Sequence, residues 1–268
     1  MLKDITLGQY FPGNSIAHRL DPRTKILLVT LYIIALFSAK GWMGYAVMAV
    51  TLAACVKVSH VGLRALVRGL KPLVFIIAFT GILNMFFTPD THYLWEWGIL
   101  RVSVKGIENA LFMVIRIMLL VMGTFLMTYT TSPISLTDGL ERLLNWMKRL
   151  HVPVHELAMM MSIALRFIPT LIEETDKIMS AQKARGADFE SGNLIQKAKA
   201  MLPILVPLFI SAFRRADELA TAMECRCYHG GEGRTKLHVL RYQRRDYIAL
   251  ALGVAILAVV ILLRQMGI

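Results

Sequence analysis

The apolar run "YIALALGVAILAVVILL" (Tyr247–Leu263) decides the fold, because it contains no charged residue. A helix that crosses the hydrocarbon core of a bilayer needs ~20 apolar residues, and this run approaches that length before its flanks are counted. The whole chain agrees with this reading, since 56% of its 268 residues are hydrophobic and its mean hydropathy is +0.56. Both values exceed those usual for soluble proteins. We therefore predict an all-α integral membrane protein.

Four more apolar runs lie nearer the N-terminus, so we expect about five transmembrane helices. The first two runs are short for a full crossing. They meet at Lys40–Gly41, which predicts a tight helical hairpin whose charged ends snorkel to the interface. Trp95 and Trp97, in the polar loop after the third run, fit an interfacial belt. The four runs are Ile26–Ala39, Trp42–Val56, Pro72–Phe87 and Gly106 to about Thr130.

The connections between these runs alternate between rich and poor in lysine and arginine, which indicates how the chain is oriented. Cytoplasmic connections hold the excess of positive charge. We therefore expect the N-terminus in the cytoplasm and the C-terminus outside. The rich connections hold Arg19, Arg23, Lys25, Lys57, Arg64, Arg68 and Lys71, and the poor ones hold Lys40, Arg101 and Lys105.

The long segment between the fourth and fifth runs divides the chain. Residues 1–130 are expected to hold the N-terminal segment and transmembrane helices 1–4, residues 131–246 a cytoplasmic coupling-helix region, and residues 247–268 the C-terminal transmembrane helix. Breakers cut the middle region into about three helices, the last of them bent by Pro203 and Pro207. These helices are Ser135–Leu150, Val154–Ala184 and Leu194–Glu224.

Two of the cytoplasmic helices look like copies of one another. In each copy an alanine lies one turn before an arginine, on the same face of the helix. The small alanine lets another backbone approach while the arginine projects beyond it. The two matching sets are Asp176, Ala181 and Arg185, and Asp217, Ala222 and Arg226.

Each arginine also ends its helix. Gly186 follows Arg185 and can supply the left-handed residue that stops a helix. The helix dipole is negative at this end, and the planar guanidinium can grip carbonyl or carboxylate oxygens of a partner. A single such end is ordinary, since arginine is common in a last helical turn. Two copies on long amphipathic helices beneath a membrane bundle favour a docking site for a cytoplasmic partner.

The sequence gives little support to nucleic-acid binding, to a zinc site or to ATP hydrolysis by the chain itself. The net charge is +12, but the basic residues border apolar runs and form no aromatic-studded patch, so nucleic acid is not expected as a partner. Cys225 and Cys227 are too close together for a zinc pair, and "HVPVHE" (His151–Glu156) lacks the His-Glu-x-x-His spacing of zinc enzymes. No phosphate-binding Gly-x-x-x-x-Gly-Lys loop is present. We predict no catalytic residue, no metal site and no cofactor.

The sequence resembles the transmembrane coupling component of energy-coupling factor (ECF) transporters, the modular vitamin and metal importers of prokaryotes. The resemblance covers nearly the whole chain. It rests on three motifs in the same order and topological places as in that family, which are "SIAHRLDPRTKI" (Ser15–Ile26), "ARG" (Ala184–Gly186) and "AMECRCY" (Ala222–Tyr228). The stretch "GGEGRT" (Gly230–Thr235) also looks like the family.

The resemblance implies a non-catalytic scaffold of an ECF-type importer in a prokaryotic plasma membrane. It implies two ATP-binding cassette ATPases and one small membrane substrate-binding subunit as partners, beside the lipid bilayer. In that family two Ala-Arg-Gly motifs end the coupling helices, and each arginine engages one ATPase. By resemblance, Ala184, Arg185, Gly186 and Arg226 have that role here.

The second motif departs from the family pattern. Cys225 and Cys227 stand where the family has alanine and glycine, within a motif that also contains Ala222 and Glu224. The arginine is kept, so we expect docking to be unharmed. We expect Gly230 to take over the role of helix stop.

Two other functions are compatible with a membrane protein. A permease subunit with its own substrate path would use two ATPase-facing helices from two copies of the chain, whereas this chain carries two itself. An intramembrane enzyme would need several polar residues at depth. Arg116 is the charge inside the fourth run, and we expect it to be paired within the bundle. Three consecutive methionines, Met159 to Met161, suggest a plastic surface that accepts several different substrate-binding subunits.

Overall fold

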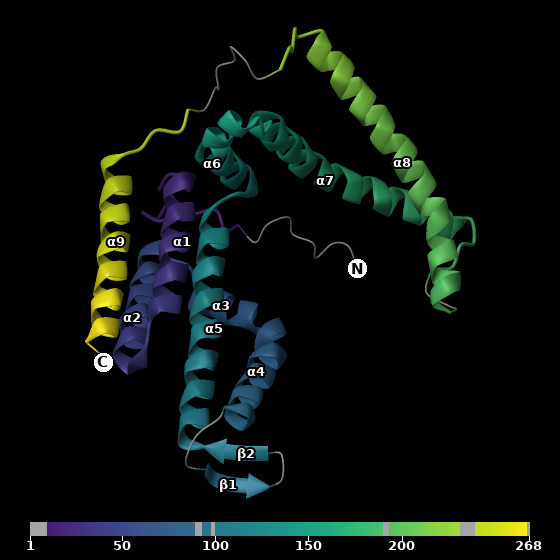
Figure 1. The fold of residues 1–268 in the computed structure, drawn as a ribbon. Helices are drawn as coiled ribbons and strands as arrows, with labels where there is room; N and C mark the ends of the chain where they lie inside the picture. Colours follow the sequence, from purple (N-terminus) through teal and green to yellow (C-terminus); the bar gives the residue numbers. More distant parts are fainter. Residues whose placement is uncertain (1–9, 89–92, 98–99, 190–192, 231–238, 267–268) are drawn as a thin grey trace. The chain divides into compact units, whose positions relative to one another are not determined.

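The chain is almost entirely helical in a computed structural model that describes residues 10–88, 93–97, 100–189, 193–230 and 239–266. Figure 1 shows the order of the elements. Two short 3-10 turns, Lys71–Leu73 and Asn145–Leu150, extend the helices before or after them. The elements are α1 (Pro22–Ser38), α2 (Gly41–Ser59), α3 (Leu63–Leu70), α4 (Val74–Phe87), β1 (Tyr93–Trp97), β2 (Leu100–Ser103), α5 (Val104–Thr130), α6 (Pro133–Leu144), α7 (Val154–Ala184), α8 (Leu194–Glu224) and α9 (Arg244–Gln265).

The predicted helices are largely confirmed. The five expected spans correspond to α1, α2, α4, α5 and α9, and the first pair breaks at Ala39–Lys40, one residue before the predicted Lys40–Gly41. The bounds predicted for α7 and α8 agree with those observed. Local chemistry explains several starts: Asp21 accepts from the Arg23 N–H at the start of α1, and Ser103 accepts from the Gly106 N–H at the start of α5.

Three details differ from the predictions. The basic stretch before the third span forms a separate helix, α3. The polar loop after that span contains an antiparallel hairpin, β1–β2; residues 89–92 and 98–99 and the hairpin side chains before Ser103, those of Trp95 and Trp97 included, lie outside the described part. The helix predicted over Ser135–Leu150 begins at Pro133, which suits the first helical position. It ends as an α-helix at Leu144, and a 3-10 turn continues to Leu150.

Within the described residues, six helical stretches are long and apolar enough to cross a membrane. They include α7 and α8, which the charge pattern placed in the cytoplasm. They leave out α1, which has 17 residues and is about 26 Å long at 1.5 Å per residue. By length and composition the chain is a multi-pass membrane protein. The six stretches are Gly41–Ser59, Leu63–Phe87, Val104–Thr130, Val154–Ala184, Ile195–Glu224 and Arg244–Gln265.

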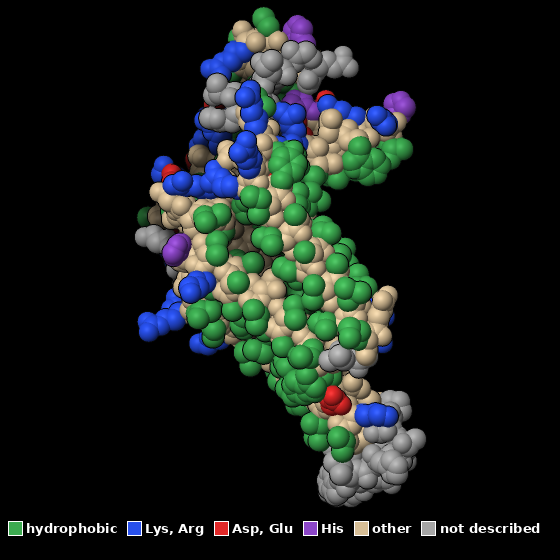
Figure 2. All heavy atoms as spheres, turned by 90° about the vertical axis from the view of Figure 1, so that its left-hand side faces the viewer, with side chains coloured by type: hydrophobic (Ala, Val, Ile, Leu, Met, Phe, Trp, Pro, Cys, Tyr) green, Lys and Arg blue, Asp and Glu red, His purple; other side chains and the backbone are tan. Residues whose placement is uncertain are grey.

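The chain divides into two compact units. The bundle unit comprises the described residues of Gly8–Arg142 and Leu240–Ile268, and the two-helix unit those of Leu143–Val239. On the face of the bundle unit shown in Figure 2, hydrophobic side chains cover α9 and its neighbours, as a lipid-facing surface requires. Its buried core draws on α1, α2, α3, α5 and α9, through Leu36, Met48, Leu66, Leu119 and Val260.

Close packing between α1 and α5 depends on a glycine. A Cβ atom on Gly123 would lie 2.5 Å from the Tyr32 ring of α1. The Tyr32 hydroxyl donates to the Leu119 carbonyl oxygen at 3.0 Å, one turn away on α5. A small residue and a buried hydroxyl with a partner therefore fix the approach of these two helices, as is common where helices pack within membranes.

One end of the bundle unit is held by polar contacts between segments far apart in the sequence. Lys25, buried at the start of α1, donates to the carbonyl oxygens of Thr130 at 2.8 Å and His18 at 3.2 Å. Asp246, buried at the start of α9, accepts from the backbone N–H groups of Asp21 at 2.9 Å and Gln243 at 2.7 Å. The starts of α1 and α9 and the end of α5 therefore meet at one end of the bundle.

The Asp21 carboxylate interacts with two nearby cations, Arg23 and Lys25, at this end of the bundle. Burial alone would raise the pKa of its carboxyl, but hydrogen bonds from the Arg23 side chain and backbone, with the charges of Arg23 and Lys25, outweigh burial and hold the pKa below its usual value. The Arg23 guanidinium lies 2.8 Å from the Asp21 carboxylate and 4.0 Å from the centre of the Tyr242 ring. Polar residues of "SIAHRLDPRTKI" thus hold this end of the bundle together.

Arg116 is paired within the bundle, as expected for a charge inside a span. Its Nε donates to the Tyr45 hydroxyl of α2 at 2.9 Å. Its guanidinium also lies 5.7 Å from the ring centres of Tyr45 and Phe37. The partner is a tyrosine and not a carboxylate, so the pair keeps a formal charge.

In the two-helix unit, α7 and α8 cross, with two polar contacts at the crossing (Figure 1). Arg215 of α8 donates to Glu174 of α7 at 2.8 Å. Gln182 of α7 reaches the Pro203 carbonyl oxygen at 3.5 Å. That oxygen has no donor within its own helix, because Pro207 lacks the N–H that would bond to it. Pro207 thus removes one backbone hydrogen bond from α8, and the Pro203 carbonyl oxygen left without that bond accepts from Gln182 of α7.

Candidate docking site at two helix ends

The end of α7 is a complete Schellman motif. The Gly186 N–H donates to the Lys183 carbonyl and the Ala187 N–H to the Gln182 carbonyl, both at 3.0 Å. Gly186 has a φ of +88°, the left-handed conformation that such an end requires. Arg185 is therefore the last residue before the turn, held by bonds on either side of it. The prediction that Gly186 stops this helix is confirmed.

The end of α8 has the same hydrogen-bond pattern. The Cys227 N–H donates to the Glu224 carbonyl at 2.8 Å, and the Tyr228 N–H to the Met223 carbonyl at 3.0 Å. Cys227 has a φ of +55° and takes the left-handed position that Gly186 has in the first motif. The expectation that Gly230 stops this helix was wrong. Gly230 also has a positive φ, +99°, but it lies beyond the two bonds that close the turn.

The two ends therefore place their arginines at equivalent positions. Arg185 directly precedes Gly186, and Arg226 directly precedes Cys227, in two turns with matching bonds. The likeness extends one turn back, where the Ser180 hydroxyl donates to the Asp176 carbonyl and the Thr221 hydroxyl to the Asp217 carbonyl. The repeat seen in the sequence is thus a repeat in backbone geometry.

Both arginine side chains are exposed, and neither makes a hydrogen bond or an ion pair within the described part of the chain. Arg215, on the same helix as Arg226, is bonded to Glu174. Each arginine follows the last turn of a helix, where the negative end of the dipole favours a cation. Five N–H donors at each end are available to a partner's carbonyl or carboxylate oxygens.

The two arginines lie well apart within the two-helix unit. Gln182, one turn before Arg185, contacts Pro203 in the first half of α8. Arg226 follows the far end of that helix, and the stretch from Pro203 to Glu224 is about 30 Å long at 1.5 Å per residue. The two arginines are therefore not adjacent, and each could be contacted separately.

The other residues predicted for this site also lie at the surface. Ala184 and Ala222 are exposed and small, so a partner can approach the helix beside each arginine. Glu224 and Cys225 are exposed as well. Of the "GGEGRT" stretch the structure describes Gly230, and residues 231–235 lie outside the described part.

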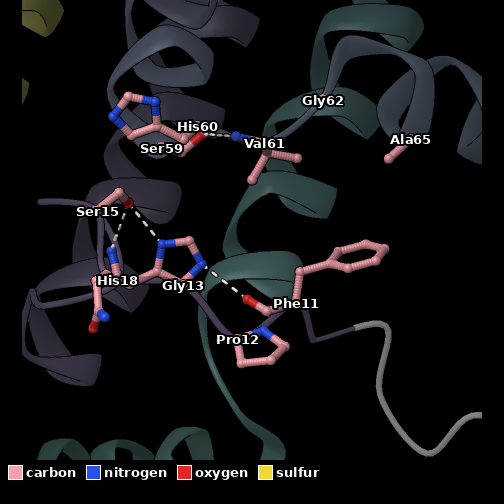
Figure 3. Close-up of a pocket in the computed structure, with 11 residues that line it drawn as sticks. Phe11, Pro12, Gly13, Ser15, His18, Ser59, His60, Val61, Gly62 and Ala65 are labelled. Atoms are coloured by element: carbon pink, nitrogen blue, oxygen red, sulfur yellow. Dashed lines mark hydrogen bonds between the residues drawn. The ribbon is translucent and has the colours of Figure 1, made fainter.

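A cavity of 570 Å³ lies elsewhere, in the bundle unit, between the N-terminal segment and the turn from α2 to α3 (Figure 3). His18 points into this region but both of its ring nitrogens have partners. Its Nδ1 lies 2.6 Å from the Ser15 hydroxyl, and its Nε2 lies 3.0 Å from the Phe11 carbonyl oxygen. Among the described residues, no group of three or more His, Cys, Asp and Glu side chains is placed to hold a metal ion.

Taken together, the helices define a multi-pass, predominantly helical membrane protein with an exposed arginine at each of two matching helix ends. The sequence matches the family described as "CbiQ: Cobalt transport protein" over residues 13–237. It is 52% identical over 263 residues, 98% of each chain, to the energy-coupling factor transporter transmembrane protein EcfT of Ruminiclostridium cellulolyticum. The proteins of the same name from Clostridium kluyveri and Bacillus subtilis are 53% and 45% identical, over 98% of this chain and 98% and 100% of theirs. The chain belongs to the family of transmembrane components of ECF transporters.

Proposed function

We propose that the chain is the non-catalytic scaffold of an ECF-type ABC importer. In this proposal it couples ATP hydrolysis by two ATPase subunits to the reorientation of a small membrane substrate-binding subunit, which takes up a vitamin or a trace metal. The observation that carries the proposal is the pair of exposed arginines in matching helix ends, neither with a partner in the described residues.

The coupling step follows from the separation of the two ends. Each ATPase holds one arginine, so the ends of α7 and α8 move with different subunits when the ATPases close on ATP. The two helices touch through a few polar contacts at their crossing, which a change of angle can rearrange. A coupling element needs different contacts in two states and no chemistry of its own. The faces of α7 and α8 that do not carry the arginines then reorient the substrate-binding subunit.

The proposal includes an orientation in a prokaryotic plasma membrane. The N-terminus and the α6–α8 region lie in the cytoplasm, and the C-terminus lies outside. The buried polar end of the bundle supports this arrangement, because it gathers Arg23, Lys25 and the basic start of α9 on one side. Cys225 and Cys227 are exposed and offer a native probe. A membrane-impermeant maleimide should label them in inside-out vesicles that contain the chain without its ATPases, and not in intact cells; the reverse result would overturn the orientation.

The test of the function is purification of the chain from its native membrane in mild detergent, with identification of the proteins that accompany it. We expect two ATPases and a small apolar membrane protein. Arg185→Glu and Arg226→Glu should each weaken ATPase binding and abolish uptake. Arg166→Glu on α7 and Arg214→Glu on α8 are matched controls, since both are exposed arginines away from a helix end, and uptake should persist in them. Recovery of a homo-oligomer without ATPases, indifferent to all four changes, would favour a permease with its own substrate path.

A further inference from the structure

Helix α3 divides its surface into three sectors. Leu66 and Leu70 are buried against the bundle core. Leu63 and Val67 are exposed apolar residues one turn apart on the adjacent side. The third sector carries a basic stripe, which we define as Arg64, Arg68 and Lys71, exposed at positions i, i+4 and i+7. A helix with one apolar side and one basic side is typical of the membrane interface.

The bundle holds α3 rigidly in place. A Cβ atom on Gly69 would lie 2.5 Å from the Phe125 ring of α5, so the two helices are in close contact. The Tyr129 hydroxyl, also on α5, lies 3.4 Å from the Ala65 carbonyl oxygen. The direction of the basic stripe is therefore fixed by tertiary packing and does not depend on a partner.

The height of α3 along the bundle follows from its neighbours. Tyr129 immediately precedes Thr130, whose carbonyl accepts from Lys25 at the polar end of the bundle. Helix α3 thus lies at the end where the membrane helices α1 and α9 begin. That is the level at which lipid headgroups, and not acyl chains, surround a spanning bundle.

The basic stripe lacks a counter-charge of its own. No Asp or Glu occurs in the sequence between Asp21 and Asp90. None of the three cations makes a hydrogen bond or an ion pair within the described part of the chain, and Asp21 is already bonded to Arg23. The three cations are therefore available to an anion from outside the described part of the chain.

We propose that α3 is a binding site for anionic phospholipid headgroups. Leu63 and Val67 lie against the upper part of the acyl chains, and the basic stripe contacts headgroup phosphates. Arginine suits this role because its planar fork can hold a phosphate with two donors. Each cation near an anionic membrane surface strengthens binding about fivefold, so loss of two should weaken retention of an anionic lipid about 25-fold.

The experiment uses the full chain with its partners, purified in nanodiscs of phosphatidylcholine with a minor fraction of phosphatidylglycerol. Native mass spectrometry counts the phosphatidylglycerol molecules retained. Arg64→Gln/Arg68→Gln should lose retained phosphatidylglycerol. The matched control, Lys40→Gln/Arg264→Gln, removes two exposed cations from the opposite end of the bundle and should keep it.

The dependence of lipid retention on salt concentration is a second test, and it uses the unaltered protein. Retention by the unaltered protein should fall as ionic strength rises, because exposed charges are screened. Equal retention by both double variants would overturn the proposal, and so would insensitivity to salt. Loss of a protein subunit from Arg64→Gln/Arg68→Gln with phosphatidylglycerol unchanged would also overturn it, since the stripe would then serve a protein partner.

Discussion

Replacing Cys227 with glycine should strengthen the end of α8. Cys227 holds a φ of +55°, and a residue with a Cβ atom pays about 1–2 kcal/mol for this left-handed conformation. Glycine adopts it freely but adds flexibility to the unfolded chain. The expected net gain is about 1 kcal/mol, equivalent to a factor of about 5 in the local opening equilibrium. Cys225, two residues earlier, is right-handed with a φ of −59°, so Cys225→Gly should weaken the same turn by about the same factor.

Amide hydrogen exchange measures this effect locally. Two backbone N–H groups close the turn: that of Cys227 donates to the Glu224 carbonyl, and that of Tyr228 donates to the Met223 carbonyl. The exchange of the Tyr228 N–H is followed in both variants, and that of the Cys227 N–H in Cys225→Gly. Protection should rise about fivefold in Cys227→Gly and fall about fivefold in Cys225→Gly. The Ala187 amide in the first motif is the internal reference and should not change. Equal protection in both variants, or a fall in Cys227→Gly, would refute the argument from left-handed strain.

Three further substitutions test the packing and the site. Asp246→Asn replaces one carboxylate oxygen with an amide nitrogen, so one of the two N–H groups that bond to Asp246, those of Asp21 and Gln243, loses its acceptor. The loss should cost about 1–3 kcal/mol of stability and lower the thermal midpoint in detergent. An unchanged midpoint would contradict the hydrogen bonds described. Gly123→Ala forces a methyl group into an aromatic ring and should cost about 1–3 kcal/mol, whereas Gly62→Ala, which meets no atom within 4 Å, should change stability by less than about 0.5 kcal/mol. Exchange of the exposed Met160 and Met161 for leucine should reduce uptake of some substrates more than others, and uniform uptake would dismiss the plastic-surface hypothesis.

The long helices were predictable because their limits are set by local chemistry. Apolar runs define the spans, and Gly186 stops α7 through its own conformational freedom. The bounds of α8 follow from Asn193, which forms a capping box with Gln196, and from the repeat of the α7 end. Arginine pairs at helix ends could therefore be identified from spacing alone.

The features that sequence analysis missed depend on tertiary contacts or on uncommon backbone choices. The segment of α3 was assigned to the basic connection before the third span because of its arginines, and its packing on Phe125 is a tertiary contact that the sequence does not show. The bond between Asp21 and Asp246 joins residues 225 positions apart, which no local pattern indicates. The preference of glycine for left-handed conformations predicted that α8 stops at Gly230. The hydrogen bonds of the last turn instead require the left-handed residue at Cys227.

The central claim is that each arginine end binds one ATPase, and native mass spectrometry of the purified complex tests it most directly. The account predicts two ATPase subunits per chain in the unaltered protein, one in Arg185→Glu, one in Arg226→Glu and none in the double variant, with two retained in Arg166→Glu and Arg214→Glu. Two ATPases retained in every variant would contradict the account, because docking would then lie elsewhere on the chain and the two helix ends would be ordinary stops.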